Sequence, residues 1–206
     1  MESVLLGIIV SVALGGGVLN LKSKKQKLAL PKMTLLVACI TFIVSAIGNI
    51  SPTVLNLLGR SLPDLQQGEI WRLFTPLFVQ DGGWAGLIFN LIALVIIGTL
   101  VENTFGKRRF LITYLIAGFV SEIAAYTMLQ HQGFAGNSVA NMGIAGLLFT
   151  ALLASKAEPV RILGLIGMGA GLTLLLTANL HGIGFAVGVV ACLYYKAKGP
   201  VHDTAK

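Results

Sequence analysis

The stretch Ser138–Ser155, with the sequence SVANMGIAGLLFTALLAS, consists mainly of apolar and small residues and carries no charge. Apolar runs of roughly 17–25 residues are long enough to cross a lipid bilayer as a helix. Comparable apolar runs occur before and after this stretch, at Ser3–Leu21, Met33–Ile50, Trp84–Glu102, Phe110–Leu129, Val160–Thr177 and Leu180–Tyr195. We therefore predict an all-α fold, a polytopic transmembrane helix bundle with seven spans.

The composition also indicates a membrane protein. Hydrophobic residues make up 55% of the chain and charged residues only 11%, whereas a soluble domain carries about 25% charged residues. Cys39 and Cys192 both fall within expected spans, where cysteine acts as a small apolar residue. Two isolated cysteines provide neither a disulfide framework nor a metal site.

The basic residues predict the orientation of the chain. Apart from Arg60 and Arg72, every Lys and Arg lies in one of four segments, 22–32, 107–109, 156–161 and 196–206. Seven spans place these four segments on one side, and short cationic loops stay in the cytoplasm. We expect the N-terminus outside and the C-terminus in the cytoplasm. The net charge of +7 then reflects topology and not nucleic-acid binding, which needs a folded platform with stacked aromatics.

A basic linker, KSKKQK at residues 22–27, separates the first expected helix from the rest. The first helix lacks a basic segment before it and an A-x-A-like cleavage site, so we expect it to remain uncleaved. The predicted organisation is an extra N-terminal helix with a basic cytoplasmic loop (1–32), a six-helix membrane domain (33–198) and a short cytoplasmic tail (199–206).

One external connection, Ser51–Gly83, is unusually long and contains Pro52, Pro63 and Pro76. Loops of this length are usually functional or lie along a surface. Its mixture of apolar and polar residues favours a segment partly immersed in the outer interface, with a plain solvent loop as the alternative.

Two polar residues stand at the external ends of expected spans. Ser138 begins one span, and His181 opens another after a short turn, so both should lie at the same face and depth. A serine hydroxyl becomes a nucleophile when a base takes its proton, and imidazole is the usual base. Backbone N–H groups at a helix start favour developing negative charge, and Asn90 is a candidate amide donor. Each residue alone is commonly structural; together they predict nucleophilic hydrolysis.

Two acidic residues lie in expected spans. Glu102 stands at the cytoplasmic end of its span, beside the basic segment 107–109, and we expect a structural role. Glu122 lies mid-span and should face the bundle interior. Because no cation is evident at its depth, we favour packing and hydrogen bonding over a proton relay or transport.

From Glu69 to its C-terminus the chain resembles the rhomboid family of intramembrane serine proteases. The matching positions follow the order of the family's motifs: Trp71-Arg72 with Thr75-Pro76, Phe89-Asn90 with Gly98, Glu102 and Gly106, Gly136-Asn137-Ser138 of its GxSG motif, and His181 with Gly184 and Gly188 of its HxxGxxxG motif. The resemblance implies a rhomboid-like six-helix core that begins with Met33–Ile50, preceded by one extra N-terminal helix.

The resemblance also implies roles for these residues. Ser138 would be the nucleophile, His181 the general base, and Asn90 part of an oxyanion hole completed by backbone N–H groups. Trp71 and Arg72 would stabilise the first external loop. Substrates would be single-span membrane proteins cleaved near a helix end, without a metal or an organic cofactor.

Three positions depart from the family pattern. Val139 replaces the glycine after the serine, Gly86 replaces a histidine four residues before Asn90, and Met142 replaces an aromatic residue four residues after Ser138. Loss of one oxyanion donor typically costs about 100- to 1,000-fold in rate. The alternative to a protease is therefore a catalytically weak or inactive relative that binds transmembrane helices without cutting them.

A small transporter is the third class of function, and it would require interior charge pairs or broken helices in both halves. Only Glu122 points in that direction. The short loops and the absence of a targeting peptide favour a bacterial plasma membrane. No feature of the sequence specifies the oligomeric state.

Overall fold

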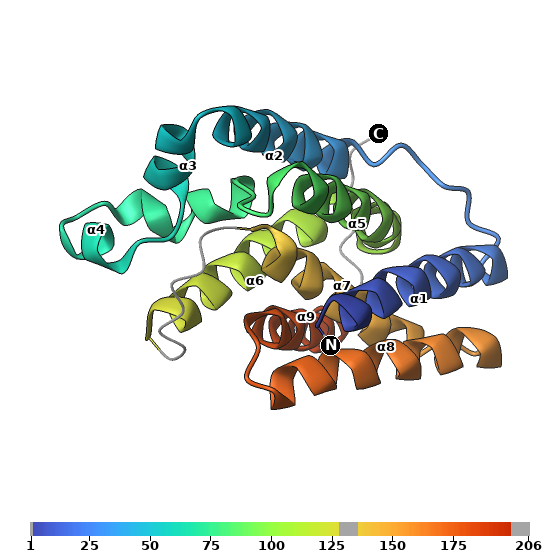
Figure 1. Ribbon diagram of the computed structural model, residues 1–206. Coiled ribbons are helices and arrows are strands. Elements are labelled where there is room, and N and C mark those ends of the chain that lie inside the picture. The colour runs from blue at the N-terminus through green and yellow to red at the C-terminus, as the bar shows by residue number, and fades with distance from the viewer. Residues whose placement is uncertain (1, 128–135, 199–206) are drawn as a thin grey trace.

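The computed structural model describes residues 2–127 and 136–198, and this part of the chain is helical without a strand (Figure 1). The elements are, in order, α1 (Glu2–Ser23), α2 (Lys32–Ile50), α3 (Pro52–Leu58), α4 (Leu62–Gln66), the 3₁₀ helices η1 (Ile70–Leu73) and η2 (Thr75–Phe78), α5 (Gly83–Phe105), α6 (Lys107–Thr127), α7 (Ser138–Leu152), α8 (Glu158–Leu176) and α9 (Leu180–Lys198). The prediction of an all-α membrane bundle is confirmed.

The expected spans differ from the observed helices mainly at α7. Six helices are long and apolar enough to cross a membrane, whereas α7 has only 15 residues and ends before Ser155. At 1.5 Å per residue it is about 22 Å long, short of the roughly 30 Å hydrocarbon core. The prediction of a full span at Ser138–Ser155 is therefore wrong in its length. The end of the expected run Phe110–Leu129 and the tail 199–206 lie outside the described residues.

The short helix α7 is the centre of the bundle. Every one of its residues except Ser138 and Ala151 is buried. It packs against α5, α6, α9, α8 and α1, and in that order each of these surrounding helices packs against the next, with α1 closing the ring on α5. A helix that is enclosed by its neighbours needs neither a lipid-facing surface nor the full length of a bilayer span.

Glycines allow α9 to approach α7 closely. A Cβ atom on Gly188 would overlap the carbonyl oxygen of Gly143, and one on Gly184 would overlap that of Val139. Small residues one turn apart permit this kind of backbone contact between membrane helices. The crossing brings the first turn of α9 beside the first turn of α7.

The extra helix α1 completes the ring around α7. In Figure 1 it lies beside α8, and it also packs against α5 and α7. Its glycines form the contact: a Cβ atom on Gly16 would meet Leu152 and Leu163, and one on Gly17 would meet Leu100. Because α5 and α8 share no substantial contact within the described residues, α1 fills the gap between them.

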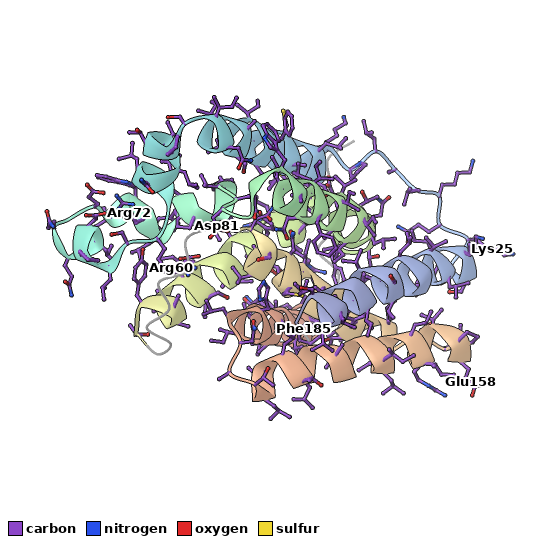
Figure 2. The ribbon with its side chains drawn as sticks, viewed as in Figure 1. Lys25, Arg60, Arg72, Asp81, Glu158 and Phe185 are labelled. Carbon is purple, nitrogen blue, oxygen red and sulfur yellow. The ribbon has the colours of Figure 1, made fainter. Side chains whose placement is uncertain are left out.

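The long external connection is folded and not a plain loop. It contains α3, α4, η1 and η2, and the buried Arg72 joins them. Its Nη1 donates to the carbonyl oxygens of Asn56 at 2.6 Å and Gly59 at 2.7 Å, and its Nη2 lies 2.6 Å from Glu69 and 3.0 Å from Asp64. Figure 2 shows Arg72 among these short helices.

Arg60 of this connection pairs with Glu122 of α6, so the expectation that Glu122 has no partner cation is wrong. Arg60 Nε donates to Oε2 and Nη2 to Oε1, both at 2.7 Å. The two side chains are 8% and 0% exposed. The pair attaches the external connection to α6, and Tyr126 adds a hydrogen bond to the carbonyl oxygen of Arg72 at 3.3 Å. Glu122 has a structural partner, as does Glu102.

Glu102 contacts the first turn of α2. Its carboxylate accepts hydrogen bonds from the amides of Met33 and Thr34, at 3.0 and 2.8 Å, and from the Thr34 hydroxyl at 2.8 Å. These amides belong to the first turn of α2, where N–H groups have no partner within the helix. Glu102 therefore holds the start of α2 against the end of α5.

Candidate active site

Ser138 is the first residue of α7, and Asn137 precedes it as the N-cap residue. The amide of Asn141 donates to the carbonyl oxygen of Asn137 at 2.9 Å and closes the first turn. The amides before it, on Ser138, Val139 and Ala140, have no acceptor within the helix. They are backbone donors next to the Ser138 hydroxyl, at the positive end of the helix dipole.

His181 is the second residue of α9, and its ring reaches Ser138. The distance from Nε2 to the Ser138 Oγ is 2.8 Å. The structure therefore brings together the two residues that the sequence singled out, across 43 positions of the chain. A hydroxyl and an imidazole nitrogen at this distance can exchange a proton directly.

Asn179 contacts the other ring nitrogen of His181. Its Oδ1 lies 2.7 Å from Nδ1 and accepts a hydrogen bond from the His181 amide at 2.9 Å. Sequence reasoning treated Asn179 only as part of a turn. Its position just before a helix is a known preference of asparagine, but its contact with the ring depends on the side-chain direction of His181.

Asn90 lies in a cluster of amide side chains beside Ser138. Its Nδ2 donates to Gln80 Oε1 at 2.9 Å, and Gln80 Nε2 donates to Asn137 Oδ1 at 2.6 Å. Asn141 Nδ2 donates to the Asn90 carbonyl oxygen at 3.1 Å. The expected donor Asn90 thus gives one of its two side-chain N–H groups to Gln80.

Gln80 was not found from the sequence, yet it borders Ser138. A Cβ atom on Gly136 would lie 3.2 Å from Gln80 Oε1 and 3.4 Å from Ser138 Oγ, so both side chains face the same small space. Gln80 is 2% exposed. The amide of Gly136 donates to the carbonyl oxygen of Pro76 at 3.1 Å and fixes this approach to α7. A glutamine in a connection gives no sequence signal of such a position.

The three departures from the family pattern differ in their surroundings. The backbone of Val139 is in close contact with Gly184, and its side chain is buried. Met142 is also buried within the core. At Gly86, in contrast, a Cβ atom would meet no heavy atom of residues 2–127 and 136–198 within 4 Å. These residues therefore leave open the space that a side chain would occupy at this position.

No metal-binding group is found among residues 2–127 and 136–198: no three His, Cys, Asp or Glu side chains gather there. The chemistry that this arrangement can perform with its own groups is proton transfer between Ser138 and His181, with backbone and amide donors nearby. Such a set can carry nucleophilic attack on a carbonyl carbon.

Comparison with known proteins gives a consistent family. The family model for the rhomboid domain matches residues 67–197. Over 123 residues, 60% of this chain and 23% of the relative, the chain is 37% identical to Rhomboid protease GluP of Bacillus subtilis (strain 168). Over 93 residues, 45% of this chain and 35% of the relative, it is 31% identical to Rhomboid-like protease 3 of Toxoplasma gondii.

A relative with a different description also matches. The chain is 26% identical to Inactive RHOMBOID-like protein 8 of Arabidopsis thaliana over 107 residues, 52% of this chain and 30% of that protein. The matched part thus spans only 23–35% of the length of these three relatives. Similarity alone therefore does not separate an active from an inactive member.

Proposed function

This chain belongs to the rhomboid family, and from that premise we propose that it is an intramembrane serine endopeptidase with a Ser138–His181 dyad. Related rhomboid proteases support proteolysis as its chemistry. The observation that carries the proposal is the 2.8 Å contact between Ser138 Oγ and His181 Nε2 at the start of two helices.

The reaction follows from this contact. Ser138 Oγ attacks the scissile carbonyl carbon while its proton passes to His181 Nε2, giving a tetrahedral oxyanion and an imidazolium. Backbone N–H groups in the first turn of α7 donate to the oxyanion, assisted by the Asn90 amide. The imidazolium then protonates the leaving amine, and the C–N bond breaks to leave an acyl-enzyme. Water, deprotonated by His181, hydrolyses the ester and restores Ser138.

The proposed substrates are single-span membrane proteins cut near the outer end of their helix. The chain is an integral multi-pass membrane protein, and Ser138 stands at the outer end of the short, enclosed helix α7. A peptide bond within a helix is hydrogen-bonded and shielded, so the substrate must unwind before it reaches Ser138. Small or helix-breaking residues near the cleavage site would lower the cost of unwinding.

The proposed orientation has the N-terminus outside and the C-terminus in the cytoplasm, in a bacterial plasma membrane. The basic segments 22–32, 107–109, 156–161 and 196–206 support this orientation. Labelling of single cysteines from either side of sealed vesicles would test it: a cysteine at Lys25 should react only from the cytoplasmic side.

The second candidate is a weak or inactive relative that binds transmembrane helices without cutting them. The observation that favours it is the pair of departures from the family pattern, Val139 next to Ser138 and Gly86 in α5, together with the similarity to a relative described as inactive. In this case the Ser138–His181 contact would remain as a structural hydrogen bond.

Reconstitution with a model single-span substrate tests both candidates. We expect the wild type to cleave the substrate in proteoliposomes, and Ser138→Ala and His181→Ala to abolish cleavage while the proteins stay folded. A fluorophosphonate probe should label Ser138 in the wild type and not in His181→Ala. Cleavage that survives Ser138→Ala would sink the dyad. Substrate binding without cleavage or labelling in the wild type would establish the second candidate.

A further inference from the structure

Asn179 holds the imidazole of His181 from the side opposite to Ser138. Its Oδ1 lies 2.7 Å from the ring Nδ1 and 2.9 Å from the main-chain nitrogen of His181. The main-chain N–H can only donate, so the Asn179 atom that faces it is the carbonyl oxygen and not the amide nitrogen. One oxygen therefore accepts from both groups of the same histidine.

This contact determines the tautomer of the neutral ring. An amide oxygen is an acceptor only, so the ring nitrogen that contacts it must carry the proton. With the proton on Nδ1, the Nε2 atom is unprotonated and can accept a hydrogen bond from the Ser138 hydroxyl, 2.8 Å away. The opposite tautomer would place a proton on Nε2, and His181 would then be unable to accept the serine proton.

The backbone around Asn179 is itself fixed. Its amide donates to the carbonyl oxygen of Leu174 at 3.1 Å, and its carbonyl oxygen accepts from the Gly182 amide at 2.9 Å. Ala178, just before it, has a positive φ of 53° and turns the chain sharply between α8 and α9. The glycine at 182 lies against the backbone of Leu174 and Leu175. The Asn179 side chain thus projects from a rigid turn.

We propose that Asn179 is a positioning residue that sets the tautomer and the orientation of His181, so that the hydrolytic unit is Ser138–His181–Asn179. The inference rests on the proposed protease function. Serine and cysteine hydrolases on other folds use an Asp or Asn in this relation to their histidine. Loss of the contact lets the ring rotate or adopt the wrong tautomer, which lowers kcat without changing how the substrate helix binds.

Helix capping is the competing explanation for the contacts of Asn179. An Asn179→Ser variant distinguishes capping from positioning of the His181 ring. Asn, Asp and Ser cap a helix start about equally well. The Ser oxygen sits one bond nearer to the backbone than Oδ1, so Asn179→Ser keeps an acceptor for the His181 amide and withdraws it from the ring. Asn179→Asp keeps both acceptors. Asn56→Ser, on an exposed part of α3, is the matched control.

The kinetic test uses the full chain in proteoliposomes with the model single-span substrate. We expect Asn179→Ser to lower kcat by roughly 10- to 100-fold with KM within about twofold of wild type. Asn179→Asp should recover kcat to within about tenfold of wild type, and Asn56→Ser should not alter it. Wild-type kcat in Asn179→Ser, or a change in KM alone, would overturn the inference.

A spectroscopic test needs no activity. The chain has three histidines, and ¹⁵N-histidine labelling, with His181→Ala to identify the signals, reports which ring nitrogen is protonated. At about pH 9, where imidazole is neutral, the wild type should show the proton on Nδ1 and Asn179→Ser a mixture of tautomers. An identical tautomer in both would refute the role of Asn179, whereas cleavage by Ser138→Ala would refute the protease proposal and leave this result untouched.

Discussion

The ion pair between Arg60 and Glu122 predicts a large and asymmetric response to substitution. The two side chains form a fork with both contacts at 2.7 Å and are 8% and 0% exposed. Removal of one member of a buried ion pair typically costs about 3–5 kcal/mol. Because Arg60 keeps slight access to solvent, we expect Glu122→Gln to lower the free energy of unfolding by about 3 kcal/mol, the lower end of this range.

Thermal unfolding in detergent, followed by circular dichroism, measures this cost. At roughly 2–4 °C per kcal/mol for a chain of this size, Glu122→Gln should lower Tm by about 6–12 °C. The double variant Arg60→Met/Glu122→Met leaves no buried charge and should recover more than half of the loss. Glu158→Gln, an exposed carboxylate on α8 (Figure 2), should shift Tm by no more than about 2 °C.

Two outcomes would refute this reasoning. An unchanged Tm in Glu122→Gln would mean that the pair contributes nothing to stability despite its burial. A double variant less stable than both single variants would mean that the pair is a net source of stability beyond the cost of an uncompensated charge. Either result would remove the basis for Arg60 as the anchor of the external connection on α6.

Three further substitutions test the surroundings of the dyad. Gly86→His places a donor in open space one turn before the Asn90 amide, and kcat should rise about tenfold; an unchanged or lower kcat would contradict a missing oxyanion donor. Gly188→Ala should abolish cleavage and lower Tm because its Cβ would overlap the α7 backbone, whereas Gly169→Ala, whose Cβ would have no described residue within 4 Å, should be neutral in both assays. Gln80→Leu removes a buried amide from the cluster beside Ser138, and we expect kcat to fall at least about threefold. A smaller fall would mean that Gln80 does not support the site.

Much of this structure could be predicted from local sequence patterns. The apolar runs located every long helix because hydropathy depends only on neighbouring residues. The starts of α7 and α9 were also predicted, at Ser138 and within one residue of His181. The length of α7 could not be predicted, because a helix enclosed by its neighbours obeys no bilayer-length requirement, and that enclosure belongs to the whole bundle.

The missed contacts share a physical reason. Arg60 and Glu122 are 62 positions apart, and Gln80 and Asn137 are 57 apart. Charge and hydrogen-bond partners at such separations depend on how the external connection folds onto α6 and α7. Asn179 and His181 are only two positions apart, yet their contact was missed because it depends on the direction of the imidazole, which also contacts Ser138 on another helix.

The polar groups at the start of α7 have a structural requirement that is independent of catalysis. A buried polar group without a partner costs about 1–3 kcal/mol, and the apolar surroundings offer few partners beyond the other helices. The groups therefore form two continuous sets, Ser138–His181–Asn179 and Asn90–Gln80–Asn137. Because Asn179 Oδ1 only accepts, satisfying these hydrogen bonds already selects the His181 tautomer with its proton on Nδ1. In that tautomer Nε2 accepts from the serine hydroxyl 2.8 Å away, which is the state that the proposed nucleophilic attack requires.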